Sequence, residues 1–160
     1  MHRLQIQDIL RPERVLLLTC SSKQEALDTL IDCLAATPEV TDSVALRREV
    51  YAREKLMSTG LGVGFGVPHV RIPSVRNLVM AVGINKQEIP DYTTLDDTYV
   101  RVVCMIAAHD DQHVPYLKAL SMLRPLMKNP AARHLLYNIK SAEAAYDLLC
   151  EYCVLSPGLD

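Results

Sequence analysis

The first third of the chain has one short apolar run and two stretches with the spacing of amphipathic helices. Residues 14–19 (RVLLLT) predict a short buried strand. An S-x-x-E capping box beginning at Ser22 predicts the start of a helix. Its apolar positions recur every three or four residues: Ala26, Leu27, Leu30, Ile31 and Leu34. A second helix, capped by Thr41 or Asp42, is expected to run to about Glu54.

The middle of the chain has two continuous apolar runs, at residues 78–84 (LVMAVGI) and 99–108 (YVRVVCMIAA). A strand that is half exposed alternates apolar and polar residues, and these runs do not alternate. They therefore predict central strands that are covered on both faces. The polar segment between them, residues 89–97 (IPDYTTLDD), predicts a loop or hairpin.

The last third of the chain is helical in pattern. From about His113 the leucines recur at helical spacing, Pro125 should kink or shorten that helix, and Pro130 opens another one. Ser141 caps a final helix. Helices before and after two fully covered strands predict an α/β fold, with a mixed central sheet that has helices on both faces.

Composition narrows the class of protein. The chain has 160 residues, of which 49% are hydrophobic and 22% charged, so we expect one globular domain over residues 1–160 with its core at about 5–150. The net charge of −2 and the lack of a basic run disfavour nucleic-acid binding. No apolar run is long enough to cross a bilayer, and no signal-peptide core is present. We therefore expect no membrane insertion and a cytoplasmic location.

Five scattered cysteines argue against a disulfide framework and for a reducing compartment. Cys150 and Cys153 form a CxxC pattern late in the chain, without the strand–helix context of a thioredoxin site. A redox or metal role and a simple packing role both remain open for this pair.

Four of the six glycines fall at every second position in residues 60–66, just before Val67, Pro68 and His69 (GLGVGFGVPH). If this segment is one extended strand, one of its faces carries only glycine, which indicates close approach by another backbone or surface. A partner protein could then reach a rigidly presented His69. The alternative is a flexible glycine loop with an ordinary surface histidine. The spacing does not match a phosphate-binding loop.

The sequence also leaves both a functional and a structural interpretation for several other reactive or charged side chains. His109 and His113 are four residues apart and could ligate a metal on a helix, although no HExxH motif is present. His113 begins the predicted helix, where an anion would be favoured, or it is simply a surface residue. Arg53 lies seven residues before Gly60, the first glycine of this segment, and Thr59 lies immediately before it. A cation there can pair with phosphate, or it can be an exposed helix charge.

The motif RE-K-L-x-ST-GLG-x-G-x-x-VPH, from Arg53 to His69, resembles the signature of the fructose/mannitol-type (type 2) enzyme IIA domains of the bacterial phosphoenolpyruvate-dependent phosphotransferase system. Similar segments extend over about residues 5–150. Gly66 stands where the family usually has alanine and Val67 where it has isoleucine, and both changes should keep the backbone path. His109 stands where proline is frequent, so it is an additional imidazole near the expected site.

The resemblance implies a phosphoryl carrier. His69 would accept the phosphoryl group on its tele nitrogen (Nε2) from the small carrier HPr and pass it to an enzyme IIB cysteine. His113 and Arg53 would stabilise the phosphoryl oxygens, and Thr59 would help to bind them. Because transfer between histidines needs no metal, we expect neither a metal nor another cofactor.

Three roles are compatible with this resemblance. The chain has no fused IIB, IIC or HPr segment and opens with LRPERVLLL, which favours a regulatory, nitrogen-type enzyme IIA that acts through its phosphorylation state on other proteins. The first alternative is a transport subunit that serves a membrane permease for a fructose- or mannitol-type sugar. The second is a binding module on the same fold that is not phosphorylated.

Overall fold

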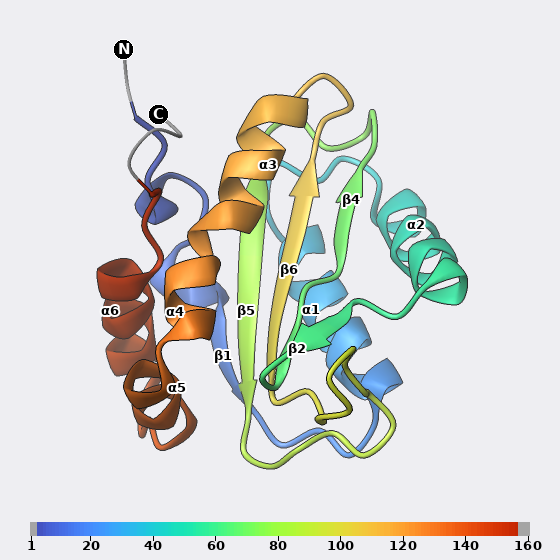
Figure 1. Cartoon of the computed structure of the whole chain (residues 1–160). Helices are drawn as coiled ribbons and strands as arrows, with labels where there is room; N and C mark the ends of the chain where they lie inside the picture. Colours follow the sequence, from blue (N-terminus) through green and yellow to red (C-terminus); the bar gives the residue numbers. More distant parts are fainter. Residues whose placement is uncertain (1–2, 157–160) are drawn as a thin grey trace.

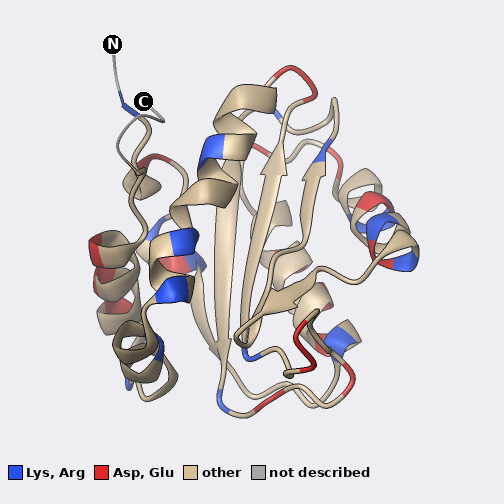
Figure 2. Ribbon diagram, viewed as in Figure 1, with Lys and Arg blue, Asp and Glu red and all other residues tan. Residues whose placement is uncertain are grey.

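Two apolar strands form the middle of the sheet, as predicted. In the computed structural model, which describes residues 3–156, β5 (Val79–Asn85) and β6 (Val102–Ala108) pair antiparallel and every residue of both is buried. Figure 2 marks the charged residues by colour, and none of them lies along these two strands. β6 begins three residues later than the apolar run, because residues 99–101 still belong to the connection from the preceding loop.

The remaining strands extend this pair into one mixed sheet with the order β1-β5-β6-β3-β2, in which β4 also pairs with β6 (Figure 1). β1 runs parallel to β5, and both β3 and β4 run parallel to β6. β2 is antiparallel to β3. The bounds of these strands are β1 (Val15–Leu18), β2 (Gly60–Gly62), β3 (Phe65–Gly66) and β4 (His69–Arg71).

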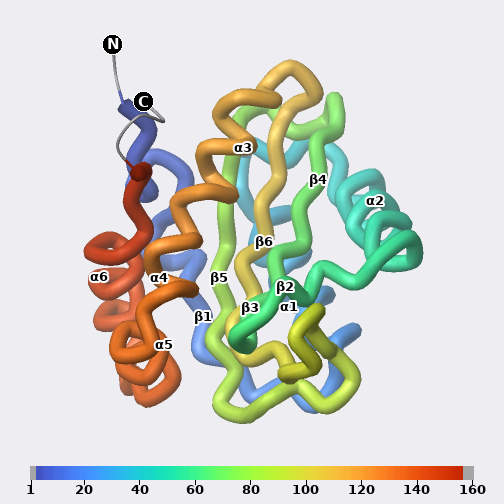
Figure 3. The backbone as a smooth tube through the Cα atoms, in the orientation of Figure 1, coloured from blue at the N-terminus to red at the C-terminus, as the bar shows by residue number. Residues whose placement is uncertain are grey.

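Helices cover both faces of the sheet, which confirms the predicted architecture (Figures 1 and 3). The helices on one face are α1 (Lys23–Ala35) and α2 (Ser43–Leu56). Those on the other face are α3 (His113–Met122), α4 (Arg124–Lys128), α5 (Pro130–Tyr137) and α6 (Ala142–Tyr152). Two short 3-10 helices precede β1, at Ile6–Asp8 and Pro12–Arg14. Each face of the sheet has its own apolar core.

The helix boundaries follow from the predicted caps. Ser22, Asp42 and Ser141 each accept a hydrogen bond from the backbone N–H three residues later. Pro125 lies in the first turn of α4, so the predicted leucine-rich helix is divided into α3 and α4. Pro130 likewise lies in the first turn of α5.

The glycine segment forms a hairpin, β2–turn–β3, and the prediction of one extended strand is wrong. Val63 and Gly64 make the turn with φ of +47° and +82°. Glycine adopts such a conformation easily, whereas a β-branched residue such as Val63 rarely does. All four glycines are buried. A Cβ atom at Gly60 would lie 2.1 Å from the carbonyl oxygen of Thr93, and one at Gly66 would lie 2.6 Å from the Tyr92 hydroxyl oxygen. At Gly60 and Gly66 the close approach is therefore made by the protein's own 92–93 segment, whereas a Cβ atom at Gly62 would meet Asp96 and one at Gly64 would meet Tyr137.

After the hairpin, the chain runs beside β6 as β3 and then β4. Phe65 pairs with Val102 and His69 with Ile106, so the register is unchanged across Val67-Pro68. The Pro68 carbonyl accepts the Ile106 N–H at 2.9 Å. This pairing places β4, which begins at His69, between β6 and α2 (Figure 1).

Candidate functional site

His69 is the first residue of β4, and the strand geometry decides what surrounds it. Successive side chains of a strand point to opposite faces. Val70 packs into the core beneath α1 and α2 and also borders the pocket, whereas His69 and Arg71 project from the opposite face of β4 and line the pocket from there. His69 is half-buried. Its ring makes an edge contact with the Tyr116 ring of α3, with 5.6 Å between centroids.

The two ring nitrogens of His69 have different partners. Nδ1 lies 2.5 Å from the carbonyl oxygen of Val67, and Nε2 lies 3.1 Å from Nη2 of Arg53. A carbonyl oxygen only accepts, so Nδ1 must carry the proton. A guanidinium only donates, so Nε2 must offer its lone pair. Both contacts select the same neutral tautomer, with its nucleophilic nitrogen toward Arg53.

Burial lowers the pKa of His69 below its ordinary value of 6.5. The hydrogen bond to the Val67 carbonyl opposes this effect, since it favours the protonated ring, and the charge of Arg53 adds to it. The pKa is lowered overall, and the imidazole is therefore neutral at pH 7, the state in which a nitrogen lone pair is available for attack.

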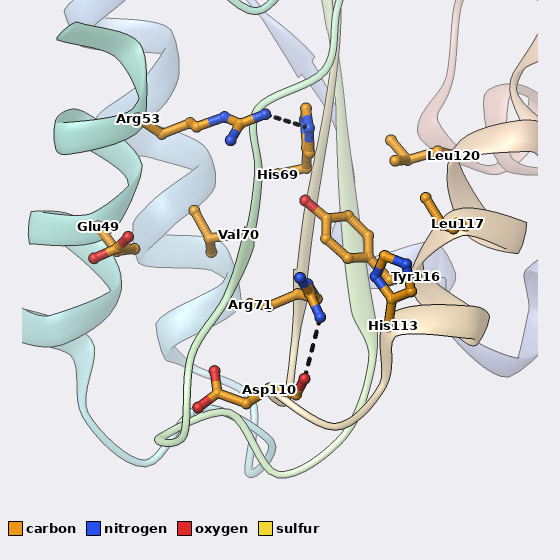
Figure 4. Close-up of a pocket in the computed structure, with 10 residues that line it drawn as sticks. All are labelled: Glu49, Arg53, His69, Val70, Arg71, Asp110, His113, Tyr116, Leu117 and Leu120. Atoms are coloured by element: carbon orange, nitrogen blue, oxygen red, sulfur yellow. Dashed lines mark hydrogen bonds between the residues drawn. The ribbon is translucent and has the colours of Figure 1, made fainter. Parts of the chain in front are cut away.

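Arg53 reaches the site from the last turn of α2, across the edge of the sheet (Figure 4). The helix packs beside β4, which brings the guanidinium to the imidazole although 16 residues separate them. Its side chain is exposed. It can therefore exchange its contact with Nε2 for contacts with an incoming anion.

The other wall of the pocket is α3, which contributes His113, Tyr116, Leu117 and Leu120 (Figure 4). His113 is the first residue of this helix, where the unpaired N–H groups favour an anion. The structure thus brings three predicted site residues, His69, Arg53 and His113, to one pocket.

Thr59 is not in that pocket. Its side chain is buried, and its hydroxyl is hydrogen bonded to the Glu54 carboxylate and to the Tyr92 hydroxyl. Because the hydroxyl is buried, paired with these two groups and not part of the pocket lining, the geometry does not support direct phosphate binding by Thr59.

His109 and the cysteine pair are also outside the pocket. His109 Nδ1 lies 2.8 Å from Asp111 Oδ1, and the imidazole is not a pocket wall. Cys150 and Cys153 line a different hollow, beside residues 3–7. Burial raises the pKa of both thiols. Among residues 3–156, no group of three or more His, Cys, Asp or Glu side chains could hold a metal ion.

A nucleophilic imidazole nitrogen beside an exposed guanidinium and a helix N-terminus suits transfer of an anionic group to that nitrogen. A comparison with protein families identifies the group that is transferred. Residues 8–152 match the model of the phosphoenolpyruvate-dependent sugar phosphotransferase system, EIIA 2. The chain belongs to this EIIA 2 family. Membership makes it a phosphotransfer component, and it confirms the family resemblance that the Arg53–His69 motif predicted.

The relatives of this EIIA 2 domain include both sugar-specific components and nitrogen regulatory proteins. It is 31% identical over 130 residues to the fructose-specific EIIABC component of Bacillus subtilis, covering 81% of this chain and 20% of that protein. It is 25% identical over 149 residues to a nitrogen regulatory protein of Pseudomonas aeruginosa, covering 92% and 96%. The chain therefore spans about a fifth of the first relative and nearly all of the second.

Solved structures agree on the fold of the EIIA 2 domain. The nitrogen regulatory protein IIA-Ntr of Neisseria meningitidis superposes with a TM-score of 0.82 at 23% identity, over 90% of this chain and 98% of that one. Enzyme IIA of the mannitol system of Escherichia coli, solved in complex with phosphorylated enzyme IIB, gives 0.73 at 20% identity, over 89% and 97%. Within the described part of the EIIA 2 domain, no helix is both long and apolar enough to cross a membrane.

Arg71 and Tyr116 are among the pocket residues of the EIIA 2 domain that the sequence pattern did not single out, as are Glu49, Val70 and Asp110. Arg71 Nη1 donates to the carbonyl oxygen of Asp110 at 3.2 Å, and its guanidinium carbon lies 5.4 Å from the centre of the Tyr116 ring (Figure 4). The signal for Arg71 was present, because a residue two positions after His69 in a strand shares its face. Tyr116 carried no comparable signal, since it follows the apolar pattern of its helix.

Proposed function

We propose that this EIIA 2 domain is a cytoplasmic phosphocarrier that accepts a phosphoryl group on Nε2 of His69 from an HPr-type phosphohistidine protein. One observation carries the proposal. Nδ1 is committed to the Val67 carbonyl, so the lone pair that the ring can use for attack is on Nε2, which faces Arg53 at the edge of an open pocket.

The transfer needs no other reactant. The Nε2 lone pair forms a bond to phosphorus while the donor's N–P bond breaks, and the departing electron pair returns to the donor imidazole. His69 keeps its Nδ1 proton and becomes positively charged, and the Val67 carbonyl oxygen 2.5 Å away stabilises that charge. The low pKa of His69 supports this step, because it keeps the ring unprotonated before attack.

Three groups stabilise the phosphoryl oxygens during transfer. Arg53 moves from Nε2 to the oxygens as the bond forms. His113 donates from the start of α3, and Arg71 contributes a second guanidinium from the strand that carries His69. Such prearranged donors act on charge that develops in the transition state. No part of this scheme requires a metal or another cofactor.

The role we favour is regulatory, with the phosphorylation state of His69 controlling the binding of target proteins. The near end-to-end match to the nitrogen regulatory protein of Pseudomonas aeruginosa supports this role. The alternative is transport, in which the phosphoryl group passes to an enzyme IIB cysteine at a fructose-type permease. The 31% identity to the Bacillus subtilis fructose component and the fold shared with the mannitol enzyme IIA of an IIA–IIB complex favour that alternative.

The test is reconstitution with phosphoenolpyruvate, enzyme I and HPr, or with their nitrogen-type counterparts. We expect an acid-labile, base-stable phosphate on the wild type and none on His69→Ala. His134→Ala, which removes an exposed histidine of α5, is the matched control and should label fully. Full labelling of His69→Ala would refute the acceptor, and an unlabelled wild type would leave the non-phosphorylated binding module as the function.

A second experiment separates the two roles. The labelled protein is mixed with a fructose-type enzyme IIB domain, and the phosphate is traced by its acid stability. Rapid appearance of acid-stable phosphocysteine would support transport and argue against a purely regulatory role. Retention of the label on His69, with target binding that changes on phosphorylation, would support regulation.

A further inference from the structure

A buried polar cluster lies outside the pocket and has no part in the transfer scheme. It consists of Glu54 at the end of α2, Lys23 at the start of α1, Thr59 and Tyr92. The side chain of Glu54 is 6% exposed, Thr59 is 4% exposed and Tyr92 is fully buried. Burial of a carboxylate and two hydroxyls is costly unless every group is paired. Burying these groups therefore costs free energy of folding, which suggests that the cluster has a function.

The directions of its hydrogen bonds follow from the chemistry of the groups. The Glu54 carboxylate accepts from the Thr59 hydroxyl and lies 2.6 Å from the Lys23 ammonium. Since Thr59 gives its proton to Glu54, its oxygen must accept from the Tyr92 hydroxyl, at 2.5 Å. Burial and the charge of Glu54 raise the pKa of Tyr92, which keeps that donor protonated. Each group of the cluster thus fixes the next.

The main chain connects this cluster to His69. The Thr59 carbonyl accepts a hydrogen bond from the Val67 N–H at 2.9 Å, and this bond holds the main chain of Val67 in place. The Val67 carbonyl in turn accepts the His69 Nδ1 proton at 2.5 Å. A displacement of Thr59 would therefore move the group that holds the imidazole in its tautomer.

We propose that Glu54, Thr59 and Tyr92 are positioning residues that hold His69 in the Nδ1–H tautomer through the main chain of Val67. Two neighbouring residues of α2 then control the two ring nitrogens. Arg53 contacts Nε2 directly, and Glu54 acts on Nδ1 through Thr59. The catalytic part of this inference rests on the proposed function, but the tautomer itself is a property of the unphosphorylated protein.

The experiment compares Thr59→Val, which keeps the shape and removes the hydroxyl, with Thr59→Ser, which keeps the hydroxyl. Imidazole ¹⁵N NMR of the unphosphorylated protein reads the tautomer, and steady-state transfer from phospho-HPr reads kcat and KM. The matched control is Thr37→Val, which removes the single hydrogen bond of a half-buried hydroxyl at the end of α1.

We expect a nearly pure Nδ1–H tautomer in the wild type, Thr59→Ser and Thr37→Val. In Thr59→Val the Nε2–H tautomer should become detectable, and kcat should fall in proportion to the Nδ1–H form that is lost, at unchanged KM, because only the Nδ1–H form offers a lone pair on Nε2. A purely structural role would lower the melting temperature without moving the ¹⁵N signals. Unchanged signals in Thr59→Val, or equal losses in Thr59→Val and Thr59→Ser, would overturn the proposal.

If Thr59→Val does not fold, Tyr92→Phe and Glu54→Gln carry the same comparison, because each keeps the side-chain shape and removes one hydrogen bond or the ion pair. An unaltered tautomer in both would also overturn the proposal. Failure of the proposed function has a different result: no label on wild-type His69. In that case the ¹⁵N measurement still decides whether the network holds the tautomer.

Discussion

Arg53 Nη2 lies 3.1 Å from His69 Nε2, so a cation of α2 sits at the nitrogen that the tautomer leaves unprotonated. We expect Arg53→Gln to slow phosphoryl acceptance about 100-fold, since one donor to the developing charge is lost. The pKa of His69 should rise, because the charge of Arg53 lowers it. Transfer kinetics and an NMR titration measure the two effects.

Arg48→Gln is the matched control for Arg53→Gln. Arg48 is an exposed arginine of the same helix that does not line the pocket. Its replacement should leave both the rate and the titration of His69 unchanged. If the two variants behave alike, Arg53 contributes only to the general charge of the surface.

The lowered pKa of His69 predicts how the reaction depends on pH. The rate of acceptance from phospho-HPr should fall as pH decreases and Nε2 becomes protonated, with its midpoint below pH 6.5. The free energy of unfolding should also depend on the protonation of His69. Its pKa is lower in the folded than in the unfolded chain, so the unfolded chain binds the proton first. The stabilising contribution is present above about pH 6.5 and is lost as pH falls through the folded pKa.

Two measurements check this dependence. A pH–rate profile gives the kinetic pKa, and urea unfolding of wild type and His69→Gln between pH 7 and pH 5 gives the linkage. The wild type should lose more stability than the variant over this range. A kinetic pKa above 6.5 would contradict the proposed effect of burial.

Arg71 should matter for transfer and not for folding. It is exposed, it lines the pocket on the face of β4 that carries His69, and its contacts are a single main-chain oxygen and the Tyr116 ring. We expect Arg71→Gln to reduce the transfer rate about 10-fold, less than Arg53→Gln because Arg71 has no contact with Nε2. Arg76→Gln, an exposed neighbour outside the pocket, should have no effect on the rate.

Much of the fold could be predicted because its signals are local. The apolar runs of β5 and β6 and the caps at Ser22, Asp42 and Ser141 each specify their element without reference to distant residues. The motif identified His69 and Arg53, but only the structure brings their nitrogens together, because the packing of α2 beside β4 is tertiary. The same holds for the close contacts between the glycine hairpin and segment 92–93, which no local pattern encodes.

Gly66 and Gly83 give the last prediction, since both lie in strands and would place a Cβ atom within 3 Å of a neighbour. At Gly66 the neighbours are the hydroxyl oxygen and ring carbon of Tyr92, at 2.6 and 2.7 Å. Tyr92 is fully buried and hydrogen bonded to Thr59, so moving it aside would disturb core packing and this hydrogen bond. At Gly83 the nearest atom, at 2.4 Å, is a terminal methyl of Leu18, which can rotate away.

We therefore expect Gly66→Ala to destabilise the fold by about 1–3 kcal/mol, the usual cost of overpacking, and Gly83→Ala to cost less. Urea unfolding of both variants measures the difference. The origin of the cost can be checked with Tyr92→Leu, which shortens the side chain that meets Gly66. Adding Gly66→Ala to Tyr92→Leu should cost less than adding it to the wild type, because the obstructing ring is gone. Equal costs in the two backgrounds would mean that Gly66 is required for another reason than the approach of Tyr92.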